Sequence, residues 1–150
     1  MPVKDWQIIV GKLLAVILFL MASVSLTVIY AITIASFGDL DAGATIGGYV
    51  GLLLLGSACA SVGMFASSLT RNQIVSFILG FAIIFALFLL DKVTAFVPSS
   101  LAGILQYMGT DFHYRNLLRG VIDSRDVLYY ISLTIFACVL TSYSMSRRPE

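Results

Sequence analysis

Charged residues are scarce in this sequence, and so are histidine and cysteine. Only 11% of the 150 residues are charged, whereas an ordinary soluble domain carries about 25%. The formal net charge of +1 provides no basic surface for nucleic acid, so we expect no nucleic-acid partner. The two cysteines, Cys59 and Cys138, fall inside apolar runs, which indicates packing rather than a disulfide framework.

Residues for several kinds of chemistry are also missing. No Gly-x-x-x-x-Gly-Lys-Ser/Thr sequence occurs, so the chain cannot hydrolyse ATP by itself. His113 has no Cys, Glu or second His at metal-ligand spacing, so we interpret it as a ring at the membrane interface. The serines inside the apolar runs have no evident base that could activate them as nucleophiles. No apolar run has a charge near its centre, which disfavours a proton-coupled antiporter. We expect no enzyme activity, no metal and no cofactor bound by this chain.

Four long apolar runs occupy most of the sequence, which is 59% hydrophobic. They cover residues 13–37, 46–69, 74–90 and 127–145. A helix needs about 20 apolar residues, at about 1.5 Å each, to cross about 30 Å of hydrocarbon. Lipid offers no hydrogen bonds to the backbone, and a closed barrel needs alternating polar positions that are absent here. We therefore predict an all-α, polytopic transmembrane helical bundle with four spans, in which residues 1–150 form a single transmembrane domain.

Residues 92–126, between the third and fourth runs, have a different pattern. After Pro98 and Ser99, apolar residues recur at i, i+3, i+4 and i+7, which predicts an amphipathic helix at the membrane interface. A second such helix is predicted to follow. We expect an interfacial or re-entrant helical segment on the external side. The residues that carry the first pattern are Leu101, Ile104, Leu105 and Met108.

The second amphipathic helix has a charged ridge and recognisable ends. Thr110 or Asp111 is expected to cap its start, and Gly120 to bend its end. Asp123, with Asp126 three residues later, resembles a capping arrangement for the last span. The ridge at i, i+4 spacing consists of Asp111, Arg115 and Arg119.

Small residues line much of the second run, and hydroxyl residues recur in the first. The glycines permit close approach of another backbone. That backbone belongs either to another helix of this chain or to a second subunit, or the glycines line the wall of a translocation path. The hydroxyls suit either a path or helix–helix hydrogen bonds. The glycines are Gly47, Gly48, Gly51, Gly56 and Gly63, and the hydroxyl residues are Ser23, Ser25, Thr27 and Thr33.

Charges beside the short loops predict the orientation. The loop at 38–45 contains two aspartates and no base, whereas the turn at 70–73 contains Arg71 and the C-terminal tail contains Arg147 and Arg148. On the positive-inside rule, both termini are expected in the cytoplasm. The turn at 70–73 is so short that the second and third spans must form an antiparallel hairpin.

Three stretches match in order and spacing a pattern known from membrane transporters. Residues 2–12 read PVKDWQIIVGK, residues 65–75 read FASSLTRNQIV, and FHY at 112–114 is followed by RGVID at 119–123. Together they resemble type 2 ABC exporter permeases, especially the gliding-motility type. In that family the three stretches correspond to the junction before the third helix, the tight cytoplasmic turn between the fourth and fifth, and the segment before the sixth.

This resemblance implies a partner and a role for several positions. The chain is expected to be a permease subunit that exports a substrate through the inner (plasma) membrane, surrounded by lipid. ATP and Mg are expected in a separate ATP-binding-cassette ATPase subunit, and a second permease chain completes a homo- or heterodimer. The candidate ATPase contacts are Asp5, Trp6, Gln7, Arg71 and Asn72, and the candidate external re-entrant segment comprises Phe112, His113, Arg115, Arg119, Gly120 and Asp123.

The chain departs from that family at its start. Family members have two further helices upstream, and the cytoplasmic coupling helix that docks on the ATPase lies between them and the point that corresponds to Met1. We therefore expect a partial permease, corresponding to the C-terminal four helices. The alternative is a small four-span membrane interaction or assembly protein without transport activity.

Overall fold

The computed structural model describes residues 4–147, so the predictions at Pro2, Val3 and Arg148 lie outside the described residues. The described part is helical and contains no strand. The elements are α1 (Asp5–Phe37), α2 (Ala42–Leu69), α3 (Gln73–Val93), the short 3-10 helix η1 (Thr94–Phe96), α4 (Ser99–Met108), α5 (Thr110–Leu118) and α6 (Ser124–Ser146).

Four of these helices are long and apolar enough to cross a membrane, which confirms the predicted all-α four-span bundle. They are α1, α2, α3 continued by η1, and α6. The 33-residue α1 starts at Asp5, ahead of the apolar run at 13–37, because Gln7 Oε1 accepts a hydrogen bond from the Lys4 backbone N–H at 3.1 Å. Such bonds satisfy backbone groups that a helix start leaves unpaired.

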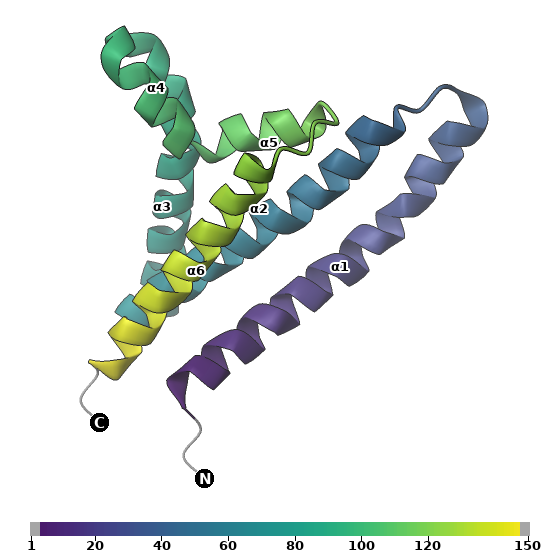
Figure 1. The fold of residues 1–150 in the computed structure, drawn as a ribbon. Helices are drawn as coiled ribbons and strands as arrows, with labels where there is room; N and C mark the ends of the chain where they lie inside the picture. Colours follow the sequence, from purple (N-terminus) through teal and green to yellow (C-terminus); the bar gives the residue numbers. More distant parts are fainter. Residues whose placement is uncertain (1–3, 148–150) are drawn as a thin grey trace.

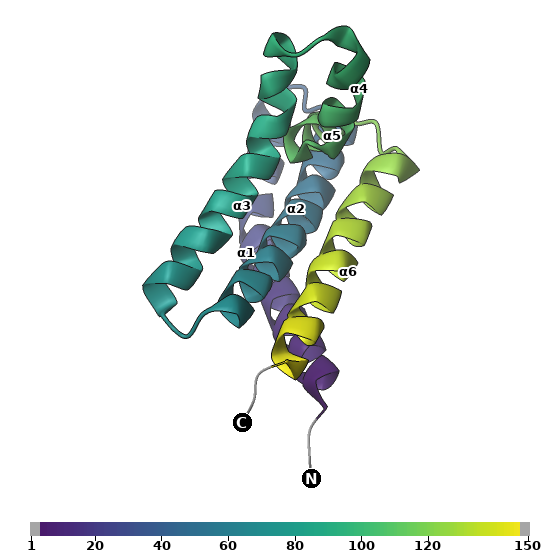
Figure 2. The ribbon, with the colours of Figure 1, turned by 90° about the vertical axis from the view of Figure 1, so that its left-hand side faces the viewer.

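The chain ends lie together at one end of the bundle, and the two short helices α4 and α5 lie at the other (Figures 1 and 2). The central helix is α2, which contacts α1, α3, α5 and α6. In Figure 1, α5 runs across the top of α2 rather than along it. The order span, span, span, two short helices, span agrees with the predicted layout, and α4 begins at the predicted Ser99.

Most of the apolar surface faces outward, as a lipid environment allows. No residue in the most apolar window of α1 is buried, and Phe19, Leu26 and Tyr30 each leave at least 70% of their surface exposed. The small core lies where α2, α5 and α6 meet, at Ala58, Leu117 and Tyr130. A helix that is apolar all round is stable only in lipid or against further helices, so this chain is a membrane protein.

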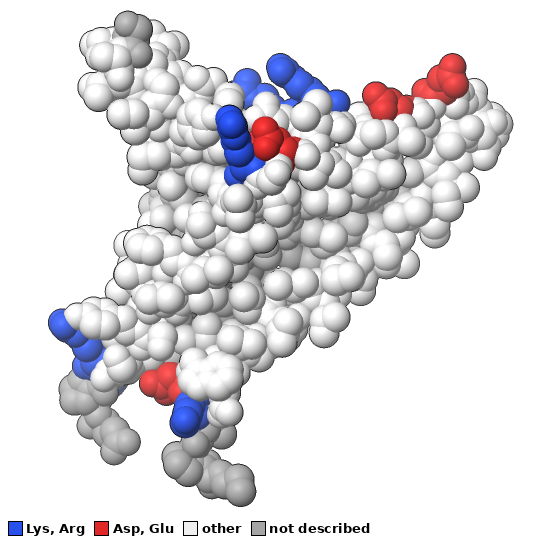
Figure 3. Space-filling model, in the orientation of Figure 1, with Lys and Arg blue, Asp and Glu red and all other residues white. Residues whose placement is uncertain are grey.

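Charged side chains gather at the two ends of the bundle and leave its middle uncharged (Figure 3). At the end with the termini, Asp5 is the only acidic residue among those described. The other end has both signs in the loops and on α5. The basic residues described at the end with the termini are Lys4, Lys12, Arg71 and Arg147.

The hydroxyl groups of α1 are bonded within that helix. Those of Ser23, Ser25, Thr27 and Thr33 each donate to a carbonyl oxygen of the preceding turn, at 2.7 to 2.8 Å. Between helices, the Tyr49 hydroxyl donates to the carbonyl oxygen of Thr27 at 3.0 Å. Backbone bonding within the helix therefore accounts for these residues, and Tyr49 of α2 also bonds to the hydroxyl and the carbonyl oxygen of Thr27.

Candidate functional site

The short helix α5 lies directly on the glycines at the start of α2. A Cβ added to Gly47 would overlap the carbonyl oxygen of Leu117, and one on Gly51 would lie 3.1 Å from the Tyr114 ring. The N-terminal glycines of α2 thus form a seat for α5, since only a residue without a side chain allows this approach. Gly56 instead meets Leu20 of α1, and a Cβ on Gly63 would meet nothing within 4 Å.

The turn after α5 is fixed by Gly120. Its φ of +77° is left-handed, and a Cβ there would lie 2.8 Å from the backbone of Gly43. A side chain is strained in this conformation and has no space beside Gly43. Gly120 therefore ends α5 and turns the chain toward α6, as the sequence suggests.

A buried histidine–aspartate pair joins α5 to α6. Nδ1 of His113 lies 2.6 Å from Oδ1 of Asp126, and both residues are 2% exposed. The other ring nitrogen, Nε2, lies 2.9 Å from the carbonyl oxygen of Tyr107 in α4. His113 thus connects α4, α5 and α6 through one ring, and it is buried among these helices.

Hydrogen bonding fixes the number of protons that this pair holds. The Tyr107 carbonyl oxygen only accepts, so Nε2 of His113 carries a hydrogen. A second hydrogen must lie between Nδ1 and Asp126 Oδ1, because two lone pairs repel at 2.6 Å. The pair is then either imidazolium with carboxylate or imidazole with carboxylic acid. Both forms are neutral overall, which makes burial at this depth tolerable.

Two tyrosines of α6 hold the joint between α4 and α5. The Tyr129 hydroxyl donates to the carbonyl oxygen of Met108 at 2.6 Å, and that of Tyr130 to the carbonyl oxygen of Thr110 at 2.8 Å. The Tyr129 ring also stacks on His113, with centroids 4.0 Å apart. These bonds satisfy carbonyls at the break between two helices. The α4–α5 joint is therefore anchored to the last span.

Charged groups tie α5 to the end of α3. The buried Asp91 carboxylate pairs with the guanidinium of Arg115, and Lys92 Nζ lies 2.5 Å from Asp111 Oδ2. Arg115 Nε also lies 3.3 Å from Asp111 Oδ2, which confirms the predicted i, i+4 contact within the ridge. A Cβ on Gly109 would lie 2.9 Å from the backbone nitrogen and the Cβ of Asp91, so the chain between α4 and α5 packs closely against the end of α3.

Several of the predicted end groups have other roles. The cap of α5 is Gly109 and makes no side-chain bond, so the expected cap at Thr110 or Asp111 is wrong; Asp111 binds Lys92 and Arg115 instead. Asp123 does cap α6, because its carboxylate accepts from the Arg125 N–H at 2.9 Å. Asp126, the expected second member of that cap, points to His113 instead.

The remaining members of the predicted external segment lie near the pair. The Phe112 ring packs edge-on against His113, with centroids 5.3 Å apart. Arg119 follows α5 and, among the described residues, makes no ion pair. It lines a polar cavity of about 260 Å³ together with Asn116, Val121, Asp123 and Asp126. The structure thus brings the predicted external residues together around α5.

The predicted ATPase contacts lie at the opposite end, with the chain termini. Asp5, Trp6 and Gln7 form the first turn of α1, and Trp6 is 55% exposed. Arg71 is exposed in the α2–α3 turn. The Asn72 side chain has a local role, since its Oδ1 caps α3 by accepting from the Ile74 N–H at 2.9 Å. Both groups lie at one end of the bundle, the first in α1 and the second in the α2–α3 turn.

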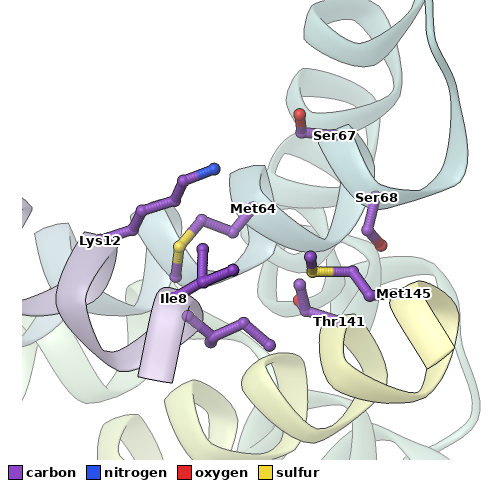
Figure 4. A pocket seen from close by; sticks show the side chains of 8 residues that line it. Ile8, Lys12, Met64, Ser67, Ser68, Thr141 and Met145 are labelled. Carbon is purple, nitrogen blue, oxygen red and sulfur yellow. The ribbon is translucent and has the colours of Figure 1, made fainter. Parts of the chain in front are cut away.

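A cavity of about 170 Å³ opens near these residues, between α1, α2 and α6 (Figure 4). Lys12 lines it from α1, Met64 from α2 and Met145 from α6. Thr141 is buried beside it and donates to the carbonyl oxygen of Ala137. This end therefore has one basic residue, Lys12, at a cavity that is lined by both apolar and hydroxyl side chains.

Comparisons with known proteins give no family for this chain. No protein-family model, no curated protein and no solved structure matches it. The class that the fold defines is thus an all-α membrane protein with four candidate spans and a pair of short helices before the last span.

Sequence reasoning did not find the His113–Asp126 pair or the Asp91–Arg115 contact. Two signals were present. Asp126 stands near the start of an apolar span, where an unpaired charge is costly, and Asp91 stands at the end of another. A search for a basic or imidazole partner for each carboxylate within the intervening segment would have pointed to His113 and Arg115.

Proposed function

We propose that this chain is a membrane-spanning permease subunit of an ATP-binding-cassette exporter, embedded in the cell's inner membrane with both termini in the cytoplasm. The observation that supports this most is the pair of short helices α4 and α5 at the end away from the termini (Figure 1). The resemblance of residues 112–114 and 119–123 to the permease segment before the sixth helix falls on α5 and on the turn that follows it.

The anchoring of α5 suits an external gate element. It is held by the buried His113–Asp126 pair, by the Asp91–Arg115 contact and by the glycine seat on α2. These contacts reach α2, α3 and α6, so a displacement of the spans moves α5 with them. In an exporter that works by alternating access, such coupling opens or closes the external side as the spans rearrange.

The end with the termini is the proposed ATPase docking surface. It carries the exposed Trp6 and Arg71, and its described charges are mostly basic. Arg71 is suited to a carboxylate on the partner, since a guanidinium binds carboxylates through two parallel hydrogen bonds. ATP and Mg bind in that partner, which performs the hydrolysis.

The export path lies between this chain and a second permease chain. Within the described residues, the cavities between α2 and α3 and between α1, α2 and α6 near Ser57 are lined mainly by aliphatic and aromatic side chains. A path for a polar substrate therefore needs walls from another chain. The outward apolar face of α1 is available for that contact or for lipid.

Photo-crosslinking in native membranes tests this function. A photoreactive amino acid at Trp6 or Arg71 is expected to capture an ATP-binding subunit, identified by peptide mass spectrometry. The matched control places the same photoreactive amino acid at Asp39, in the loop at the opposite end, where it is expected to capture no ATP-binding subunit. If the purified native complex contains no ATPase and none is captured near Arg71, the permease function is excluded.

A four-span interaction or assembly protein is the second candidate. The observation in its favour is that the hydroxyls of Ser23, Ser25, Thr27 and Thr33 each donate to a carbonyl oxygen of their own helix, so these residues of α1 offer little to a polar path. ATPase-dependent transport by vesicles that contain the 150-residue chain would exclude this candidate.

A further inference from the structure

A polar cavity of about 260 Å³ lies at the turn from α5 to α6, at the end of the bundle away from the termini. It is lined by Asn116, Arg119, Val121, Asp123 and Asp126. Its walls are held in place by Gly120, whose left-handed turn lies against Gly43. The cavity belongs neither to the proposed ATPase surface nor to the boundary between the spans.

Asp126 lines this cavity, and one of its oxygens has no hydrogen-bond donor among the described residues. Oδ1 is bonded to His113, whereas Oδ2 is buried and unpartnered. Asp126 as a whole is 2% exposed. A buried carboxylate oxygen without a donor is costly, so a group that donates a hydrogen bond to this oxygen would be favoured.

The cavity has further acceptors. Asp123 uses Oδ1 to cap α6, which leaves its second oxygen available. The Asn116 amide nitrogen faces Asp126 Oδ1 at 3.4 Å, which leaves its carbonyl oxygen available. A primary ammonium group has three N–H donors. Its three donors match the three acceptors of Asp126, Asp123 and Asn116.

Arg119 adds a positive charge to the same cavity. Among the described residues it makes no ion pair, and its guanidinium suits a phosphate. Next to it, Val121 and Ile122 are 62% and 51% exposed. Acceptors for an ammonium, a guanidinium for an anion and apolar neighbours thus stand together at the end of a membrane span.

We propose that this cavity binds a primary ammonium group linked to a phosphate, as in the headgroup of an aminophospholipid. The ammonium donates to Asp126 Oδ2 and to the oxygens of Asp123 and Asn116. The phosphate lies on Arg119, and the acyl chains run along Val121 and Ile122. The bound headgroup contacts residues on both sides of the α5–α6 turn. Its binding does not require an ATPase partner.

Lipid retention by the purified full chain tests this site. Native mass spectrometry is performed after incubation with phosphatidylethanolamine, phosphatidylcholine or phosphatidylglycerol. Phosphatidylcholine keeps the phosphate but has no N–H donor, and phosphatidylglycerol has no ammonium. We expect phosphatidylethanolamine to be retained about tenfold better than either of the others, a difference of about 1.4 kcal/mol.

Variants separate the site from general charge effects. Arg119→Gln removes the guanidinium, and Asp123→Ser removes a carboxylate while keeping a residue that caps helices. Both positions are exposed, so both variants are expected to fold. Arg119→Gln is expected to lower the retention of phosphatidylethanolamine and phosphatidylcholine alike, whereas Asp123→Ser is expected to lower the preference between them. Arg125→Gln is the control, because Arg125 is exposed beside Asp123 and does not line the cavity; it is expected to keep the preference.

Soluble phosphoethanolamine distinguishes the source of the ligand. If it displaces the lipid at comparable concentration, the site binds the free headgroup; if only the lipid is retained, the site is a lipid site. Equal retention of phosphatidylethanolamine and phosphatidylcholine overturns the proposal. So does an equal loss in Arg119→Gln and Arg125→Gln.

Discussion

His113 and Asp126 form a buried contact between two helices that the sequence separates by a turn. Nδ1 of His113 lies 2.6 Å from Oδ1 of Asp126, and the ring stacks on Tyr129 one turn further along α6. Because the opposite ring nitrogen is bonded to the Tyr107 carbonyl oxygen, the imidazole is fixed on both sides. The last span and the two short helices therefore form one unit.

His113→Ala is expected to destabilise the protein strongly. It leaves Asp126 buried without its partner, and removing one member of a buried pair costs about 3–5 kcal/mol. Asp126→Asn is expected to cost less, since the amide nitrogen can donate to Nδ1 while Nε2 still donates to Tyr107. Unfolding of the purified chain in mixed micelles with increasing SDS measures both.

The double variant His113→Ala with Asp126→Ala checks that the effect belongs to the pair. Its loss of stability is expected to be smaller than the sum of the two single alanine losses, because no charge is left unpaired. Purely additive losses would show that the two side chains stabilise the fold separately.

Gly47→Ala is expected to loosen α5 from α2. The new Cβ would overlap the carbonyl oxygen of Leu117, and such overpacking costs about 1–3 kcal/mol. Gly63→Ala is the matched control in the same helix, because its Cβ meets nothing within 4 Å and alanine favours helix by about 0.5–1 kcal/mol. SDS unfolding compares the stability of the two variants directly. Equal stability would contradict the close packing of α5 on Gly47 of α2.

The fold was largely predictable from the sequence because lipid imposes a length. The four apolar runs correspond to the four candidate spans, and the short turn at 70–73 does join α2 and α3 as a hairpin. Periodicity also located α4, with its start at Ser99, and the cap of α6 at Asp123. Helix ends were less predictable, since α1 extends to Asp5 through a bond between Lys4 and Gln7.

The contacts around α5 were not predictable in the same way. Periodicity tells which residues share a face of a helix, but not which other helix that face meets. The partners of His113 depend on the left-handed turn at Gly120 and on its approach to Gly43. Asp111 looked like a cap by its position, yet Lys92 of α3 offers it a stronger, charge-assisted bond.

Arg115→Gln is expected to destabilise the protein by about 1–3 kcal/mol, because it leaves the Asp91 carboxylate buried with a weaker partner. Lys92→Gln is expected to cause a smaller loss, since Lys92 lies 3.3 Å from Asp91 and is largely solvated. SDS unfolding at low and high salt measures both. If the Lys92 variant is the less stable of the two, the contacts of Lys92 with Asp111 and Asp91 contribute more than the Arg115–Asp91 pair.

Cysteine labelling tests the arrangement of the ends. Cys59 and Cys138 lie within the spans, so both are first replaced by alanine. Single cysteines at Asp39 and Arg125 are then expected to react in intact cells with a maleimide that cannot cross the membrane. Cysteines at Asp5 and Arg71 are expected to react only after permeabilisation, since they lie at the end with the termini. If the cysteines that replace Asp5 and Asp39 are labelled from the same side of the membrane, the chain between them does not span the membrane.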